Sequence, residues 1–332
     1  MNQQNRVIRI EDFHKQGEIS TSENSWAVAI GDFDGLHLGH RALFAELAAK
    51  KKELGIETAA ITFDPHPLLT IFGKAPLYLN SLEDKIKMLL HYYGADEVIV
   101  LPFNKEFAAM EQSEFIDEIL IKKLNIKHIV VGFNFTFAKN GAGKAEDLKN
   151  ICADRQIGVS IMPATESMHG IISSTLIRSY IEEGKLEEAN SLLGYWYFIS
   201  GEVLTGRQVG RGIGYATANI ELDKEQCRPP RGVYAVRIDY DGMTYDGIAN
   251  IGNRPTFAQE NLPEILEVHL FAEESLHLYG QNLRVYLGKY LRAEQRFDSI
   301  DALKAQIARD KSAAEEFLSS CSTLEHLPRP IK

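Results

Sequence analysis

The sequence predicts two domains of different class: a parallel α/β domain, then a small antiparallel β-barrel with a C-terminal helix. Three observations carry this prediction. The length of 332 residues suits two cores at roughly 150 residues per domain. The first half alternates short apolar runs with amphipathic segments, as βαβ units do. From Tyr197 onward the chain changes to closely spaced β-type runs, separated by glycines and turn pairs.

The predicted elements of the first half follow one another in strand–helix order. We expect strands over 26–30, 58–63, 98–103 and 128–133, and helices over 38–54, 81–93 and 111–124. Parallel sheets bind ligands beyond the carboxyl ends of their strands. The polar residues that follow each apolar run are therefore the candidates for a site.

The second half begins after a helical pattern over 174–193, which we expect to be one helix ending at Gly194. With no Pro/Ser-rich linker in this region, we place the domains at 1–187 and 188–332. Predicted strands cover 198–204, 217–222, 232–240, 244–251, 265–271 and 283–291, and a helix covers 299–320. The pair Asp241-Gly242 predicts a hairpin turn.

Composition narrows the class of protein. Lys plus Arg number 36 against 46 Asp plus Glu, so the net charge is −10 and broad nucleic-acid binding is not expected. The three cysteines are too sparse for a disulfide framework or a zinc site. Neither a signal peptide nor an apolar run of about 18 residues is evident. We expect a cytoplasmic protein with no membrane partner.

A phosphate-handling motif follows the first apolar run. Three glycines and two histidines three residues apart open a helix, in the order Gly31-Asp32-Phe33-Asp34-Gly35-Leu36-His37-Leu38-Gly39-His40. The glycines allow close approach of the backbone, and a helix N-terminus favours anions. The alternatives are a surface turn with two solvated histidines, and a zinc site that lacks a third ligand at a suitable spacing. The strand–glycine–histidine–helix context favours the phosphate site.

Three further segments of the first half follow apolar runs or open a helix. Pro65 and Pro67 make a stiff loop that is either a turn or the wall of a pocket. Asn134, among three phenylalanines over 131–137, suits the binding of a base or flat ring, although core packing explains each phenylalanine. Ser174, Thr175 and Arg178 form either a helix cap or a phosphate clamp.

The second half carries a different set of polar groups. Gly206, Arg211 and Gly212 lie in a glycine–arginine loop that can wrap phosphates. Thr217 and Asn219, two residues apart, share a strand face and offer neutral oxygens to a hard cation. Glu267, flanked by apolar residues, can take a proton from an alcohol. An ordinary hairpin with polar strand residues is the alternative.

Together these motifs resemble the bacterial bifunctional riboflavin kinase/FMN adenylyltransferase family over nearly the whole chain. The matching elements, in order, are GDFDGLHLGH, TFDPHP, VGFNFTF, ISSTLIR, GRQVGRGIGYATANI, RGVYAV, GIANIGNRPTF, EVHLF, LYG and YLRAEQRF. The resemblance implies a nucleotidyltransferase-type α/β domain followed by a riboflavin kinase barrel. It implies ATP, riboflavin, FMN and FAD as substrates and products, and Mg²⁺ as cofactor, and leaves the oligomeric state open.

The resemblance also assigns roles to residues. His37 and His40 would stabilise the ATP phosphates during adenylyl transfer, and Glu267 would be the base that activates riboflavin. Thr217 and Asn219 would hold Mg²⁺-ATP. The remaining nucleotide-binding residues would be Gly31, Asp32, Phe33, Gly39, Asn134, Ser174, Thr175, Arg178, Gly206, Arg211 and Gly212. The flavin-binding residues would be Pro65, Pro67, Gly232 and Tyr234.

The chain departs from the family pattern mainly in its second half. Ala216 stands where proline is usual, Thr205 where histidine is common, and Phe271-Ala272-Glu273 where Leu-Asp-Phe is usual. Two alternatives to a bifunctional enzyme therefore stay open. In one, only the adenylyltransferase is active and the barrel is a flavin-binding module. In the other, the chain is a regulatory flavin-binding protein without catalysis, against which the retained candidate residues argue.

Overall fold

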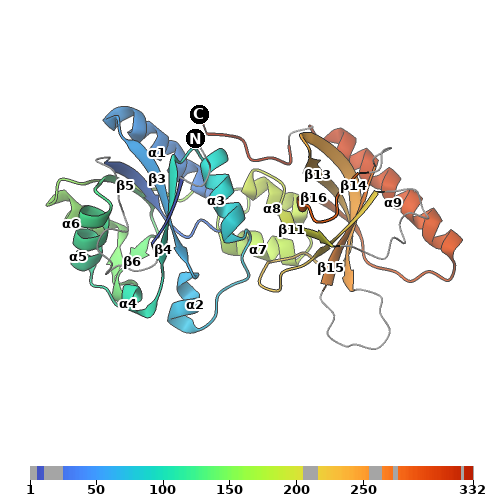
Figure 1. Cartoon of the computed structure of the whole chain (residues 1–332), viewed down its shortest axis with the longest axis horizontal. Helices are drawn as coiled ribbons and strands as arrows, with labels where there is room; N and C mark the ends of the chain where they lie inside the picture. The colour runs from blue at the N-terminus through green and yellow to red at the C-terminus, as the bar shows by residue number, and fades with distance from the viewer. Residues whose placement is uncertain are drawn as a thin grey trace. The chain divides into compact units, whose positions relative to one another are not determined.

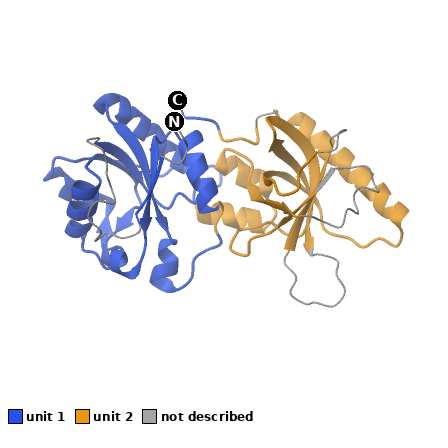
Figure 2. Ribbon diagram, viewed as in Figure 1, with its two compact units in different colours: residues 1–77, 81–173, 329–332 blue, residues 78–80, 174–328 orange. Residues whose placement is uncertain are grey.

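The computed structural model describes residues 6–10, 25–204, 216–253, 264–271, 276–322 and 325–331. Contacts divide the chain into two compact units (Figure 2). Unit 1 comprises residues 1–77, 81–173 and 329–332, and unit 2 comprises residues 78–80 and 174–328.

Unit 1 is built on a six-stranded sheet in the order β1-β4-β3-β2-β5-β8, and all its strand pairs are parallel (Figure 1). The predicted parallel α/β class is confirmed. The central strand β2 is buried along its whole length, which explains its unbroken apolar sequence. The strands are β1 (Val7–Arg9), β2 (Trp26–Ile30), β3 (Glu57–Asp64), β4 (Glu97–Pro102), β5 (Ile126–Gly132) and β8 (Gly158–Met162).

Helices flank this sheet: α1 packs on β2 and β5, α3 on β4, and α6 on β8. The predicted helix over 111–124 is present, but most of it winds as the π-helix η2 (Phe115–Lys123). The other helices of the unit are α1 (Leu38–Leu54), α2 (Pro67–Phe72), α3 (Leu82–His91), α4 (Lys105–Ala108), α5 (Gln112–Glu114), η3 (Lys139–Gly141) and α6 (Ala145–Ala153). Two small hairpins add β6 (Thr136–Phe137) with β7 (Gly143–Lys144), and β9 (Glu166–Ser167) with β10 (Gly170–Ile171).

Unit 2 contains a closed antiparallel barrel in the order β11-β12-β15-β14-β13-β16, which confirms the predicted barrel. Successive side chains on each strand point to opposite faces of the barrel. On β15, Leu266, Val268 and Leu270 are therefore buried, while Glu267 and His269, on the opposite face, are partly exposed. The strands are β11 (Phe198–Leu204), β12 (Ala216–Glu221), β13 (Gly232–Tyr240), β14 (Met243–Asn253), β15 (Glu264–Leu270) and β16 (Asn282–Arg292).

The helical segment before the barrel differs from the prediction. Instead of one helix over 174–193, the structure has α7 (Ser174–Glu182) and α8 (Leu186–Leu193), both in unit 2. Gly184, between them, has a φ of 75°, a left-handed conformation that ends a helix. The apolar spacing continues through this break because α7 and α8 pack against each other.

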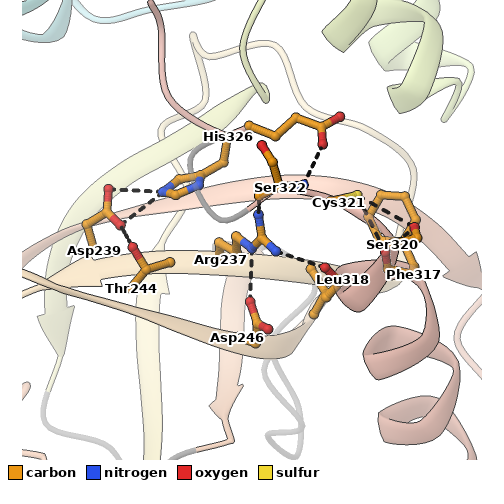
Figure 3. A network of polar contacts seen from close by, with 11 residues as sticks. Arg237, Asp239, Thr244, Asp246, Phe317, Leu318, Ser320, Cys321, Ser322 and His326 are labelled. Carbon is orange, nitrogen blue, oxygen red and sulfur yellow. Dashed lines mark hydrogen bonds and ion pairs between the residues drawn. The ribbon is translucent and has the colours of Figure 1, made fainter.

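The C-terminal helix α9 (Ile300–Ser320) is tied to the barrel by Arg237 of β13 (Figure 3). The guanidinium is almost fully buried and donates to the carbonyls of Leu318, at 2.9 Å, and Ser322, at 2.6 Å. It also donates to Asp246 Oδ1 at 2.9 Å. At the C-terminus of α9, these bonds add to those from the Cys321 amide to the Leu318 carbonyl, at 3.2 Å, and from the Glu325 amide to the Ser322 carbonyl, at 3.1 Å.

His326 anchors the segment that follows α9. Its Nε2 lies 3.0 Å from Asp239 Oδ1, and Thr244 donates to the same carboxylate at 2.7 Å (Figure 3). Burial opposes ionisation of Asp239, but the bonds from His326 and Thr244 outweigh it, so the pKa of Asp239 lies below its usual value. Neighbouring side chains on β13 thus hold both α9 and the chain beyond it.

We expect Arg237→Met to lower the free energy of unfolding of unit 2 by about 2–4 kcal/mol, because it removes the buried guanidinium that joins the Leu318 and Ser322 carbonyls to Asp246 through three charge-assisted hydrogen bonds. Scanning calorimetry measures the change. The control is Arg309→Met, which removes an exposed guanidinium that donates to Gln306 Oε1, and which we expect to cost under about 0.5 kcal/mol. Equal losses for both variants would contradict the role of Arg237.

Candidate active sites

Three of the four first-half motifs meet at one edge of the unit 1 sheet. β2 pairs with β3 on one side and with β5 on the other. The carboxyl ends of these strands lead into Gly31, Pro65 and Phe133 respectively. Adjacent parallel strands therefore bring the glycine–histidine segment, the proline loop and the Asn134 segment to one edge, as the sequence predicts.

His37 and His40 lie against each other at the N-terminus of α1. Their ring centroids are 3.8 Å apart with 15° between the planes. The Nδ1 of His37 accepts the amide of His40 at 3.3 Å and so caps the helix. A Cβ on Gly39 would lie 3.0 Å from the His37 ring, so glycine at this position leaves room for the capping imidazole. Because Nδ1 accepts, the neutral ring carries its proton on Nε2.

Burial keeps both imidazoles neutral. Desolvation lowers the pKa of His37 from 6.5 to about 4. The pKa of His40 lies well below its usual value, chiefly through burial and then through the charges of His37 and Lys85. Each ring is therefore an uncharged N–H donor at neutral pH, suited to an anionic ligand.

A lysine that sequence reasoning missed lies beside this pair. Lys85 of α3 is 6% exposed and donates to the main-chain oxygen of Asp32 at 2.5 Å. Its ammonium is 3.4 Å from Asp32 Oδ1, and Asp32 Oδ2 is 3.6 Å from His66 Nε2. Asp32 thus lies between Lys85 of α3 and His66 of the proline loop. The sequence did contain a signal for this buried lysine. Its spacing from Leu82 and Leu89 puts Lys85 on the apolar side of the helix.

Phe33 supplies a backbone donor in the same segment. The residue is 1% exposed and its φ is 56°, in the left-handed region that a bulky side chain rarely adopts. Among the residues that the structure describes, its amide has no hydrogen-bond partner. A buried amide without a partner is rare and suits an anionic ligand.

The remaining predicted residues of the first-half motifs differ in exposure. Asn134 is exposed after β5, and Phe137 belongs to the core, as the packing alternative holds. Pro67 is the first residue of α2, and Pro65 precedes it in the loop. The set Ser174, Thr175 and Arg178 lies on α7, which groups with unit 2 rather than with the histidine pair.

In unit 2, strand register gathers a carboxylate and two amides on one barrel face. β15 lies between β12 and β14, and Glu267 pairs with Asn219 on one side and with Asn250 on the other. The side chain of Glu267 is 39% exposed. Directly opposed residues have their Cβ atoms about 4.5–5.5 Å apart. Glu267 is therefore reachable by a ligand and flanked by carboxamides, of which the sequence predicted only Asn219.

His269 lies two residues beyond Glu267 on β15 and so shares its face. Its Nε2 is 3.9 Å from Glu267 Oε1, and its backbone pairs with Thr217. Burial lowers the pKa of His269, so the ring is neutral beside the carboxylate. The side chain of Thr217 and the residues Gly206, Arg211 and Gly212 lie outside the described part of the chain.

The two barrel residues predicted to bind flavin lie on β13. Gly232 begins the strand, where a Cβ would come within 2.4 Å of the Arg292 carbonyl. Tyr234 is fully buried, and its hydroxyl donates to the Pro230 carbonyl. Burial raises the pKa of this phenol.

The barrel face offers hard oxygen ligands of the kind that Mg²⁺ takes together with nucleotide phosphates. Mg²⁺ in such sites is held through one or two protein groups and the phosphates, and the carboxamide of Asn219 is a suitable neutral donor. Within the described ranges, no group of three or more His, Cys, Asp or Glu forms an all-protein metal site. The carboxamide oxygen of Asn219 suits a metal ion whose other ligands are nucleotide phosphates.

The fold and the two clusters define a class of protein in which a parallel α/β unit with a histidine pair and a closed antiparallel barrel with an exposed carboxylate share one chain. A profile described as FAD synthetase matches residues 19–176, and one described as riboflavin kinase matches residues 193–318. The chain belongs to the bifunctional riboflavin kinase/FMN adenylyltransferase family.

Relatives that carry this family name match over almost their whole length. The Escherichia coli protein is 40% identical over 87% of this chain and 92% of its own, and the Bacillus subtilis protein is 36% identical over 92% and 97%. A Streptococcus pneumoniae crystal structure titled macrolide-efflux protein has a TM-score of 0.81 and 32% identity, covering 93% of this chain and 99% of that one. Within the described ranges, no helix has the length and apolar composition that a bilayer-spanning segment needs.

The buried histidine predicts a pH dependence of stability. The unfolded chain binds a proton at His37 below pH 6.5, whereas the folded chain resists it down to about pH 4. Stability should therefore fall as the pH drops from 6.5 to 4. We expect His37→Asn, which keeps a capping side chain and cannot titrate, to flatten this fall by on the order of 1–3 kcal/mol in denaturant titrations at each pH. If the stability of wild type and of His37→Asn fell equally with pH, the lowered pKa of His37 would be contradicted.

Proposed function

We propose that the chain makes FMN from riboflavin and ATP in unit 2, and FAD from FMN and a second ATP in unit 1. The observation that carries the proposal is that the histidine pair and Glu267 belong to different compact units, each with its own set of polar groups. Full-length relatives of the same family name support it. The domain boundary after residue 187, the cytoplasmic location and the use of Mg²⁺ are parts of the same proposal.

In the kinase step, Glu267 acts as the general base. Its carboxylate takes the proton of the terminal ribityl hydroxyl while that oxygen attacks the γ-phosphorus of ATP, and the bond to the β-phosphate oxygen breaks to release ADP. Asn219 and Thr217 would hold a divalent metal ion, which would supply neutralisation of phosphate charge. Exposure of Glu267 and its register between Asn219 and Asn250 support this role.

In the adenylyl-transfer step, the residues of unit 1 bind and neutralise rather than exchange protons. A phosphate oxygen of FMN attacks the α-phosphorus of ATP, and the bond to the β-phosphate breaks to release pyrophosphate. The N–H groups of His37 and His40 and the amide of Phe33 donate to phosphate oxygens as charge moves onto the leaving group. The burial of His37 and Phe33 supports this role, because preorganised donors act strongly where water is excluded.

Conversion of riboflavin with Mg²⁺ and ATP, followed by chromatography of the flavins, tests the proposal and the role of Glu267. Wild type should yield both FMN and FAD. Glu267→Gln keeps the shape and removes the base, and we expect FMN formation to fall about 10²-fold or more while adenylylation of supplied FMN stays within about twofold. Equal loss of both activities would contradict separate sites.

The same assay tests the histidine pair. We expect His37→Asn to lower FAD formation from supplied FMN by about 10²-fold, because it removes a donor to the transition state while retaining a capping group. FMN formation from riboflavin is the internal control and should not change. An unaltered rate of FAD formation would remove His37 from the site.

A further inference from the structure

Neither the sequence motifs nor the family assignment explains why Lys85 of α3 is buried. Lys85 is 6% exposed, whereas Lys87 on the same helix is exposed. Ordering and desolvating a lysine is costly unless its ammonium is paired. Lys85 uses one donor on the main-chain oxygen of Asp32 at 2.5 Å, and its ammonium is also 3.4 Å from Asp32 Oδ1.

The Asp32 carbonyl is held by two donors from different elements. Besides Lys85, Thr62 of β3 donates its hydroxyl to the same oxygen at 3.2 Å. Thr62 is fully buried, so this contact is shielded from water. Two buried donors on one carbonyl fix the orientation of the peptide plane that joins Asp32 to Phe33.

That peptide plane also determines where the Phe33 amide points. In a trans peptide the C=O and the N–H lie in one plane and point in opposite directions. Holding the carbonyl toward Lys85 and Thr62 therefore turns the Phe33 N–H the other way. Phe33 has a φ of 56°, a conformation that costs energy for a bulky residue and persists only where surrounding contacts enforce it. The two donors supply such contacts.

The charge of Lys85 is already compensated by the segment that it holds. The Asp32 carboxylate lies beside the ammonium, with His66 Nε2 3.6 Å from the other carboxylate oxygen. Because its charge is paired within the protein, Lys85 is better suited to orienting the backbone than to binding the charge of a ligand. We propose that Lys85 is a positioning residue for adenylyl transfer, which holds the Asp32–Phe33 peptide so that the Phe33 amide donates to a nucleotide phosphate. The inference rests on the function proposed for unit 1.

The experiment compares Lys85→Met with the matched control Lys87→Met in the full-length protein. We expect Lys85→Met to lower kcat/KM for FAD formation from FMN and ATP by about 30-fold, mostly in kcat, because misplaced transition-state donors cost one to two orders of magnitude. The control should stay within about twofold. FMN formation from riboflavin, measured on the same samples, reports whether unit 2 is intact, and thermal unfolding reports the overall fold.

Thr62→Val separates positioning from a direct effect of charge and keeps the test open if Lys85→Met fails to fold. This variant is nearly isosteric and removes the second donor from the same carbonyl. For Thr62→Val we expect kcat/KM to fall about fivefold. Because both groups act on the same peptide, the double variant with Lys85→Met should lose clearly less than the product of the two single losses. The positioning role would be overturned if the double variant lost the full product of the two single losses. It would also be overturned if Thr62→Val lost no kcat/KM.

The outcomes also distinguish this inference from the function on which it rests. If wild type makes no FAD from FMN, the proposed function of unit 1 fails and the inference fails with it. If wild type makes FAD and Lys85→Met matches Lys87→Met, only the positioning role is wrong. A rise in the KM for ATP of about tenfold with unchanged kcat in Lys85→Met would also overturn it, because that result indicates direct electrostatic binding of the nucleotide.

Discussion

Hydrogen-bond register between neighbouring strands is the constraint on which both candidate sites depend. β2 lies between β3 and β5, so three segments far apart in sequence end at one edge of the unit 1 sheet. In the barrel, β15 lies between β12 and β14, which brings two carboxamides to Glu267. A slip of one residue in β15 would turn Glu267 toward the core and bury its charge. The chemistry of each unit therefore rests on backbone pairing.

Electrostatics at the unit 1 site are set by burial more than by net charge. The chain carries −10, and the two imidazoles that face one another there are neutral. The cation beside them, Lys85, is paired with Asp32. A polyanionic nucleotide is thus met by oriented N–H groups, which cost little reorganisation when charge shifts during the reaction. This arrangement reconciles an acidic protein with phosphate chemistry.

Much of the fold was predictable because periodicity and turn residues act locally. The barrel strands were found to within about two residues, and Asp241 and Gly242 adopt the positive φ values that their pairing predicts. Among the features that were missed, three depended on tertiary contacts. The break at Gly184 is hidden by an apolar pattern that continues into α8. Asn250 becomes a neighbour of Glu267 only through the register in which β14 pairs with β15. Lys85 looks like an ordinary helix residue until Asp32 is placed beside it.

Closure of the barrel also limits how copies of this chain could associate through their strands. Every strand in the ring has two neighbours, so the described strands of the barrel present no free edge onto which another strand could add. The open sheet of unit 1 ends at β1, which has three residues, and at β8, which has five. Among the principal sheets in the described part of the chain, edge-to-edge β-association would therefore have to use unit 1, where short border strands offer few backbone groups for it.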